Sequence, residues 1–123
     1  MQWTFAHEAE LGLLIVRTAG IADEASTLEM IQALREAMQR HQVTRCLIDH
    51  RAISAVQGGT LAVYGRPAQV RQQHRPPRGL KLVEVVRPEH EEHFRFLETV
   101  FHNRGIDFTV LHDYDAALQI LTQ

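Results

Sequence analysis

The sequence predicts an α/β domain with a mixed, mostly parallel sheet, in the order β-β-α-β-α-β-α-β-α. Short apolar runs of strand length recur along the chain, and between most of them lie stretches with apolar residues every three or four positions. The first two runs follow each other across a tight turn, which predicts a hairpin. Each later run follows a helical stretch, which predicts parallel strands joined by crossovers.

The length and composition predict one globular domain covering residues 1–123. Apolar residues make up 45% of the chain, charged residues make up 23%, and the formal net charge is -2, which argues against a protein built for nucleic acid. No apolar run approaches the roughly 18 residues of a membrane span. The chain start lacks a signal-peptide pattern and the single cysteine excludes an internal disulfide, so we expect a cytoplasmic protein.

The first third of the chain predicts the hairpin and a helix. Residues 2–7 and 13–19 read as its two strands. In the helix, Ser26 and Glu29 have the spacing of a capping box, while Asp23 is an alternative, earlier cap. The apolar positions that define the helix are Leu28, Ile31, Leu34 and Met38.

The third strand and the loop after it form the most informative stretch. The continuous apolar run 46–48 predicts a strand buried on both faces, with Cys46 as a core residue rather than a nucleophile. We expect this strand to end on Asp49 and to lead, through a loop, to an interrupted helix over 60–74.

The last third predicts strand, helix, strand and helix. Strands are expected over 80–86 and 106–111. Pro88 suits the start of the helix between them and Gly105 suits its end, while Asp113 is expected to cap the final helix.

The carboxyl end of the third strand is the expected ligand site. Ligands of α/β sheets sit beyond such strand ends, and backbone N–H groups at a helix start favour anions. From His50 to Val83 there is no acidic residue and there are six basic ones. This run is either an ordinary solvated face or an electropositive rim for an anion or an acidic partner. The candidate ligand-binding residues are Asp49, Arg51, Gln57, Gly58, Gly59 and Thr60.

Signals for catalysis and for metal binding are thin. No nucleophile elbow, Walker loop or dinucleotide fingerprint occurs. A small enzyme that uses Asp49 and His50 is the alternative function, although neighbouring strand residues point to opposite faces. His90 and His93 lie three apart on one expected helix, without a clear third ligand, His112 being the candidate for it. We therefore expect no catalytic residue, no metal site and no cofactor.

Several local marks are shared with a known family. They are Gly20 after the second strand, Leu47-Ile48-Asp49 ending the third, Asn103-Arg104-Gly105 before the last strand, and the run Asp113-Tyr114-Asp115-Ala116-Ala117-Leu118. In these residues and in its predicted element order, the sequence resembles the STAS domain of bacterial anti-sigma factor antagonists, especially its divergent SpoIIAA-like relatives. The resemblance covers nearly the whole chain and implies the same fold.

The resemblance also implies what this chain lacks. The antagonists' switch segment, D-L-S-G-V-S-F-I-D-S-S-G-L in generic form, lies without a gap on residues 49–61. Its aspartate before the phosphorylated serine falls on Gln57, and its serine pair falls on Gly58 and Gly59. Glycine has no hydroxyl to phosphorylate, so a phosphoserine switch is not expected; Thr60 is the alternative acceptor.

Together these observations predict a non-enzymatic, STAS-like regulatory or small-ligand-binding module. Its expected partner is a protein or a small anionic ligand near residues 49–61. Nucleic acid is not expected, because Tyr64 is the one aromatic residue of the basic run. The sequence leaves a homodimer open.

Overall fold

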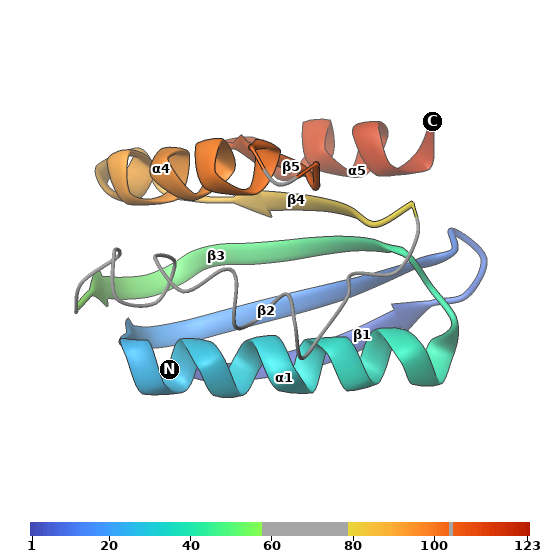
Figure 1. Cartoon of the computed structure of the whole chain (residues 1–123), viewed down its shortest axis with the longest axis horizontal. Coiled ribbons are helices and arrows are strands. Elements are labelled where there is room, and N and C mark those ends of the chain that lie inside the picture. The colour runs from blue at the N-terminus through green and yellow to red at the C-terminus, as the bar shows by residue number, and fades with distance from the viewer. Residues whose placement is uncertain (58–78, 104) are drawn as a thin grey trace.

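The computed structural model describes residues 1–57, 79–103 and 105–123, which form one five-stranded sheet with helices on both faces (Figure 1). The strands stand in the sheet in chain order: β1 (Gln2–Glu8), β2 (Leu13–Ala22), β3 (Arg45–Val56), β4 (Lys81–Val85) and β5 (Asp107–Leu111). The helices are α1 (Glu24–His41), α4 (Glu91–His102) and α5 (Tyr114–Thr122), and a short 3-10 turn, η1 (Pro88–His90), precedes α4. The predicted α/β class is confirmed.

The strand directions follow the prediction. β1 and β2 form an antiparallel hairpin, and β3, β4 and β5 each run parallel to the strand before them. The hairpin turn contains Gly12 at φ +67°, a left-handed conformation that favours glycine. The helix expected over 60–74 lies outside the described residues.

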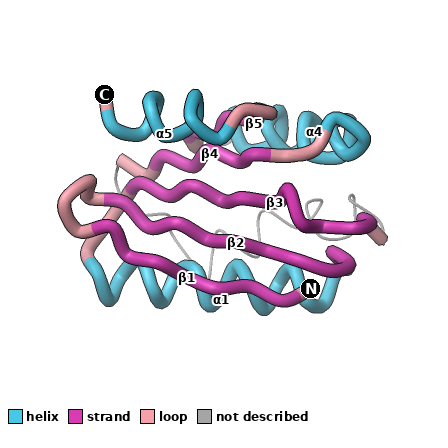
Figure 2. Tube along the Cα trace, turned by 180° about the vertical axis from the view of Figure 1, so that it is seen from behind, coloured by secondary structure: helices cyan, strands magenta, loops and turns pink. Residues whose placement is uncertain are grey.

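The two faces of the sheet carry different helices (Figures 1 and 2). On the first, here called the α1/α4 face, α1 packs on Leu14, Val16 and Ile48, and α4 packs on β5. On the second, the α5 face, Ala117 and Leu121 of α5 pack on a separate apolar cluster of the sheet. Alternation of side chains along each strand separates the two clusters.

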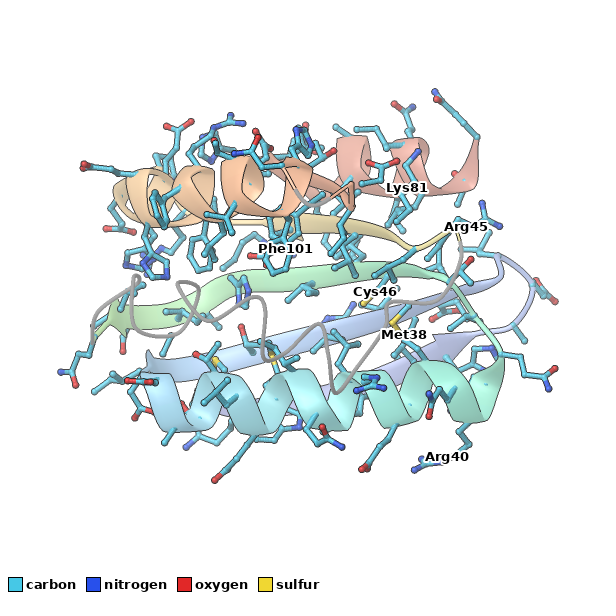
Figure 3. All side chains as sticks on the ribbon, in the orientation of Figure 1. Met38, Arg40, Arg45, Cys46, Lys81 and Phe101 are labelled. Carbon is cyan, nitrogen blue, oxygen red and sulfur yellow. The ribbon has the colours of Figure 1, made fainter. Side chains whose placement is uncertain are left out.

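Cys46 lies in the core of the α1/α4 face, as predicted. Its side chain is completely buried in the same cluster as Met38 of α1 (Figure 3). Burial, together with the nearby charge of Glu84, raises the pKa of the thiol. The thiolate is therefore disfavoured, which agrees with a structural role.

The prediction that the third strand ends on Asp49 is wrong. β3 continues to Val56, because it pairs with β2 as far as Ala22. Beside β4 the pairing stops at Asp49, so among the described strands the first five residues of β3 are the ones with a strand on each side. The apolar run 46–48 belongs to that part, while the later residues of β3 mix polar and apolar types.

β3 also contains two irregularities in its pairing with β2. Arg17 lies opposite Asp49 and Ala19 lies opposite Ala52, so His50 and Arg51 together oppose one residue of β2, Thr18. A second extra residue of β3 follows opposite Gly20 and Ile21. Such bulges bend a strand and redirect its side chains.

Side chains bind both ends of α5 and the N-terminus of α1. Asp23 is the N-cap of α1 and forms a capping box with Ser26, which confirms the alternative cap of the sequence reading. Asp113 caps α5, as predicted. At the other end of α5, Arg45 and Lys81 from the amino ends of β3 and β4 donate to the carbonyls of Leu121 and Ile120 (Figure 3). Among the described residues no helix is long and apolar enough to cross a membrane.

Candidate functional site

Asp49 and Arg51 form a close ion pair on the α5 face of β3. Nε of Arg51 donates to Oδ1 of Asp49 at 2.9 Å, and Nη2 donates to Oδ2 at 2.9 Å. The backbone N–H of Arg51 also donates to Oδ1, at 3.0 Å. Burial would raise the pKa of Asp49, but these hydrogen bonds and the charges of Arg51 and Arg17 outweigh it, so the pKa lies below its ordinary value.

The guanidinium of Arg51 lies against Tyr114, the first residue of α5. Its Cζ is 4.8 Å from the ring centroid, and Cζ of Arg17 is 5.9 Å from the same centroid. Arg17 also donates from Nη2 to the Tyr114 hydroxyl at 3.2 Å. Exposed Arg17 and Arg51 and half-buried Tyr114 thus form one surface, here called the Tyr114 surface.

The Tyr114 surface is close to neutral in charge. Its two arginines lie beside the carboxylate of Asp49, and Asp115 is close enough to help raise the pKa of Arg51. Two positive and two negative charges therefore occupy this region, so it attracts a free anion only weakly.

The structure brings together two of the six predicted ligand-binding residues. Asp49 and Arg51 bind each other. Gln57 follows the end of β3, where its backbone N–H donates to the carbonyl of Ala22 at 2.8 Å. Gly58, Gly59 and Thr60 lie outside the described residues, and so do four of the six residues of the basic run. The other two, Arg51 and Lys81, have the structural partners given above.

His50 lies on the opposite face from Asp49 and belongs to a buried polar chain. Its Nδ1 is 2.7 Å from Oγ1 of Thr18 on β2, and its Nε2 is 3.0 Å from Oε2 of Glu84 on β4. Its ring stacks on Phe94 of α4, with the centroids 4.8 Å apart. Thr18, His50 and Glu84 are all at least nine-tenths buried. Asp49 and His50 therefore do not form the acid/base pair of the alternative function.

His93 is the other histidine near this chain. It lies on α4, next to Phe94, and its pKa is lowered by burial and by the charges of His50 and His90, against the opposing charge of Glu84. Within residues 1–57, 79–103 and 105–123, no group of three or more His, Cys, Asp or Glu side chains is placed to hold a metal ion.

Sequence reasoning missed Thr18, Glu84, Arg17 and Tyr114. Glu84 could have been found, because a lone carboxylate inside the apolar run LVEVV implies a buried charge that needs a partner. Tyr114 and Arg17 gave no such signal, since 97 positions separate them in the sequence.

The geometry described above matches several solved structures. An anti-sigma factor antagonist from Mycobacterium paratuberculosis superposes with a TM-score of 0.63 and 16% identity, over 99% of this chain and 96% of that one. An uncharacterized DUF3478-family protein with a SpoIIAA-like fold, from Shewanella loihica PV-4, gives a TM-score of 0.59 and 16% identity over 98% of this chain and 92% of that one. The protein has a SpoIIAA-like fold.

A third SpoIIAA-like structure agrees with this result. The anti-sigma factor antagonist SpoIIAA in its unphosphorylated form gives a TM-score of 0.51 and 16% identity, over 85% of this chain and all of that one. No family model matches the sequence, and no curated protein matches it. The protein therefore shares the SpoIIAA-like architecture with these structures but has little sequence identity to them.

Proposed function

We propose that this protein is a non-enzymatic regulatory module that acts by binding a protein partner at the Tyr114 surface. The SpoIIAA-like fold supports a regulatory role, because two of the matching structures are named anti-sigma factor antagonists, a name that describes action on another protein. The fold alone does not decide function, so the proposal depends on the surface itself.

The observation that carries the proposal is that Asp49 holds Arg51 in place. Three hydrogen bonds to one buried carboxylate fix an arginine whose side chain is still 50% exposed. A side chain that is already ordered loses less entropy when a partner binds. Arginine and tyrosine are also the residue types that dominate binding energy at protein interfaces.

The charge balance favours a protein partner over a small anion. Asp49 and Asp115 offset the charges of Arg17 and Arg51, so a free phosphate or carboxylate gains little attraction there. A protein surface can instead combine polar contacts with packing against Tyr114. An anion site made by Gly58, Gly59 and Thr60 remains a prediction of the sequence.

The enzyme alternative has weaker support. Asp49 and His50 would have to act on one substrate, yet their side chains contact groups on opposite faces of the sheet. His50 is also 96% buried, between β2, β4 and α4, which limits access to it.

The experiment compares Arg51→Ala with Arg95→Ala. Arg95 on α4 is a matched control, because its side chain is 45% exposed and is also ion-paired, to Glu91 and Glu98. Each immobilised variant is incubated with lysate of the source organism, and a protein retained by the parent is identified, purified and titrated by calorimetry. We expect Arg51→Ala to weaken binding at least about tenfold, as for an interface hot spot, and Arg95→Ala to leave it unchanged.

Circular dichroism of each variant establishes that it is folded before binding is compared. A purified partner that binds the parent and folded Arg51→Ala with equal affinity would show that the Tyr114 surface is not the docking site. A parent that retains no specific protein, but is stabilised by phosphate more than by chloride at equal ionic strength, would favour the small-anion function instead.

A further inference from the structure

We propose that the outer edge of β1 binds an extended segment of a protein partner, which adds to the sheet as a further strand. The segment turns apolar side chains toward the α1 side of the sheet and places a basic side chain beside Glu8. This edge is not part of the Tyr114 surface, so the proposal does not depend on the one above.

β1 is an edge strand that carries none of the usual guards against pairing. Among the described strands it pairs with β2 alone, over all seven of its residues and in one unbroken register. An edge strand turns a row of N–H and C=O groups outward, and proline, lysine or a bulge commonly protects it. The sequence of β1, QWTFAHE, contains no proline and no lysine, and its register contains no bulge.

The opposite edge of the sheet is guarded by a side chain. On β5, the backbone N–H of Val110 donates to Oε2 of Glu98 on α4, at 2.6 Å. Glu98 thus occupies a backbone donor that an added strand would need. Among the described residues, no side chain does the same for residues 2–7 of β1. Of the two edges, β1 is therefore the one that can accept a strand.

The side of β1 that faces α1 is partly apolar. Trp3 packs against the core of the α1/α4 face, and the ring of His7 stacks on His41 at the end of α1, with the centroids 4.2 Å apart. Phe5 lies between them on the same side of the strand and is exposed. Aromatic side chains pair favourably with aromatic or β-branched ones on a neighbouring strand. The segment should therefore carry such a residue beside Phe5.

The other side of β1 supplies a charge. Ala6 packs toward the α5 face, so Glu8 points to that face as well. Glu8 is exposed and has no ion pair with any of the described residues. Opposite charges on neighbouring strands stabilise their pairing. A lysine or arginine beside Glu8 therefore complements this end of the edge.

The position of α1 favours a single added strand over a second copy of the protein. Figure 2 shows α1 running along the edge of the sheet behind β1. Two copies joined through β1 would place both α1 helices on the same side of the joined sheet, next to the two-fold axis. Neighbouring strands are about 4.8 Å apart, whereas packed helices need about 8 to 10 Å between their axes. The two helices would therefore compete for the same space, and a single strand brings no helix with it.

The probe for this edge is a phage-displayed library of random linear peptides, selected on the immobilised protein. An enriched peptide is synthesised and added to the parent, and hydrogen exchange of the amides of residues 2–8 is followed by NMR. Successive N–H groups of a strand point alternately to its two neighbours. We expect every second amide of β1 to exchange fast in the free protein and at least about tenfold more slowly with the peptide bound.

Two variants and a matched control test the two sides of the strand. Phe5→Lys should weaken peptide binding at least about tenfold by calorimetry, because lysine on an edge opposes pairing. Phe96→Lys is the control, since Phe96 on α4 is 41% exposed and Phe5 is 36% exposed, and it should bind as the parent does. Glu8→Lys should also weaken binding, and a peptide whose basic residue is changed to glutamate should restore it.

Amide exchange in the parent decides the outcome even if Phe5→Lys does not fold. A library that yields no binding peptide, or a peptide that leaves the exchange of β1 unchanged, would overturn the proposal. So would equal binding by folded Phe5→Lys and Phe96→Lys. Slow exchange of all the β1 amides in the free protein would show that the edge is already covered, and sedimentation velocity would then assign the cover to a second copy or to the chain itself.

Discussion

The carboxylate of Asp49 orders the side chains around it through a series of contacts. It fixes Arg51 through both of its oxygens, and Arg51 in turn lies against Tyr114. These contacts offset the cost of burying the carboxylate, and they keep its pKa below the ordinary value. A single neutral substitution at this position should therefore disturb a whole surface.

We predict that Asp49→Asn lowers stability at neutral pH but not in acid. A depressed folded pKa means that the carboxylate adds stability above about pH 3.9, the unfolded value, and that this stability is lost as the pH falls through the folded pKa. The variant should be about 1 to 2 kcal/mol less stable than the parent at pH 7, and urea unfolding of both proteins measures this difference in the free energy of unfolding. A difference that does not shrink as the pH falls below about 3.9 would show that charge is not its cause.

At the scale of single elements, α5 shows how far local sequence rules reach. Asp113 was identified as its N-cap from the sequence, and its Oδ1 accepts from the backbone of Asp115 and Ala116. The opposite end depends on Arg45 and Lys81, which come from distant strands and carry no local signal. The helix is therefore secured at one end by its own sequence and at the other by the sheet.

We predict that Asp113→Ala destabilises the protein by about 1 kcal/mol, because two backbone N–H groups lose their acceptor. Asp113→Asn is the control, since asparagine caps a helix about as well as aspartate does. Thermal unfolding of both variants measures the difference. Equal losses in the two would assign the effect to charge rather than to the cap.

The third strand and the residues around it could be predicted from the sequence only in part. The sequence predicts its residues 46–48 because both faces of the strand are covered there, by the α1 cluster and by the α5 cluster, so all three residues are apolar. The sequence predicts a loop over residues 50–56, because a strand that contains two bulges and, among the described strands, pairs there with β2 alone shows no regular alternation. Asp49 and Arg51 could be chosen from the strand end alone. Arg17 and Tyr114 could not, because the sheet register places Arg17 opposite Asp49 and the packing of α5 on the sheet brings Tyr114 to both.

At the scale of the whole molecule, β3 lies between the two apolar layers that hold the fold together. Ile48 faces α1 and Leu47 faces α5, and both are buried. The central strand therefore contributes to both cores, and damage to it should spread through the protein.

We predict that Ile48→Ala costs about 2 to 5 kcal/mol, a large part of the stability of a small domain. Phe96→Ala on α4 is the control, because Phe96 is 41% exposed and its loss should change stability by about 0.5 kcal/mol or less. Guanidinium midpoints rank the two variants. A greater loss in Phe96→Ala would contradict the assignment of the core.

The order of the strands also bears on how the chain assembles while it is made. Because each strand lies beside the one synthesised before it, no strand has to insert between two that are already paired. The hairpin can form first, and each later strand can then add to the single growing edge as it leaves the ribosome. Among the described strands, β1 stays at one edge of the sheet throughout, and the other edge passes from β2 to β5 as strands are added.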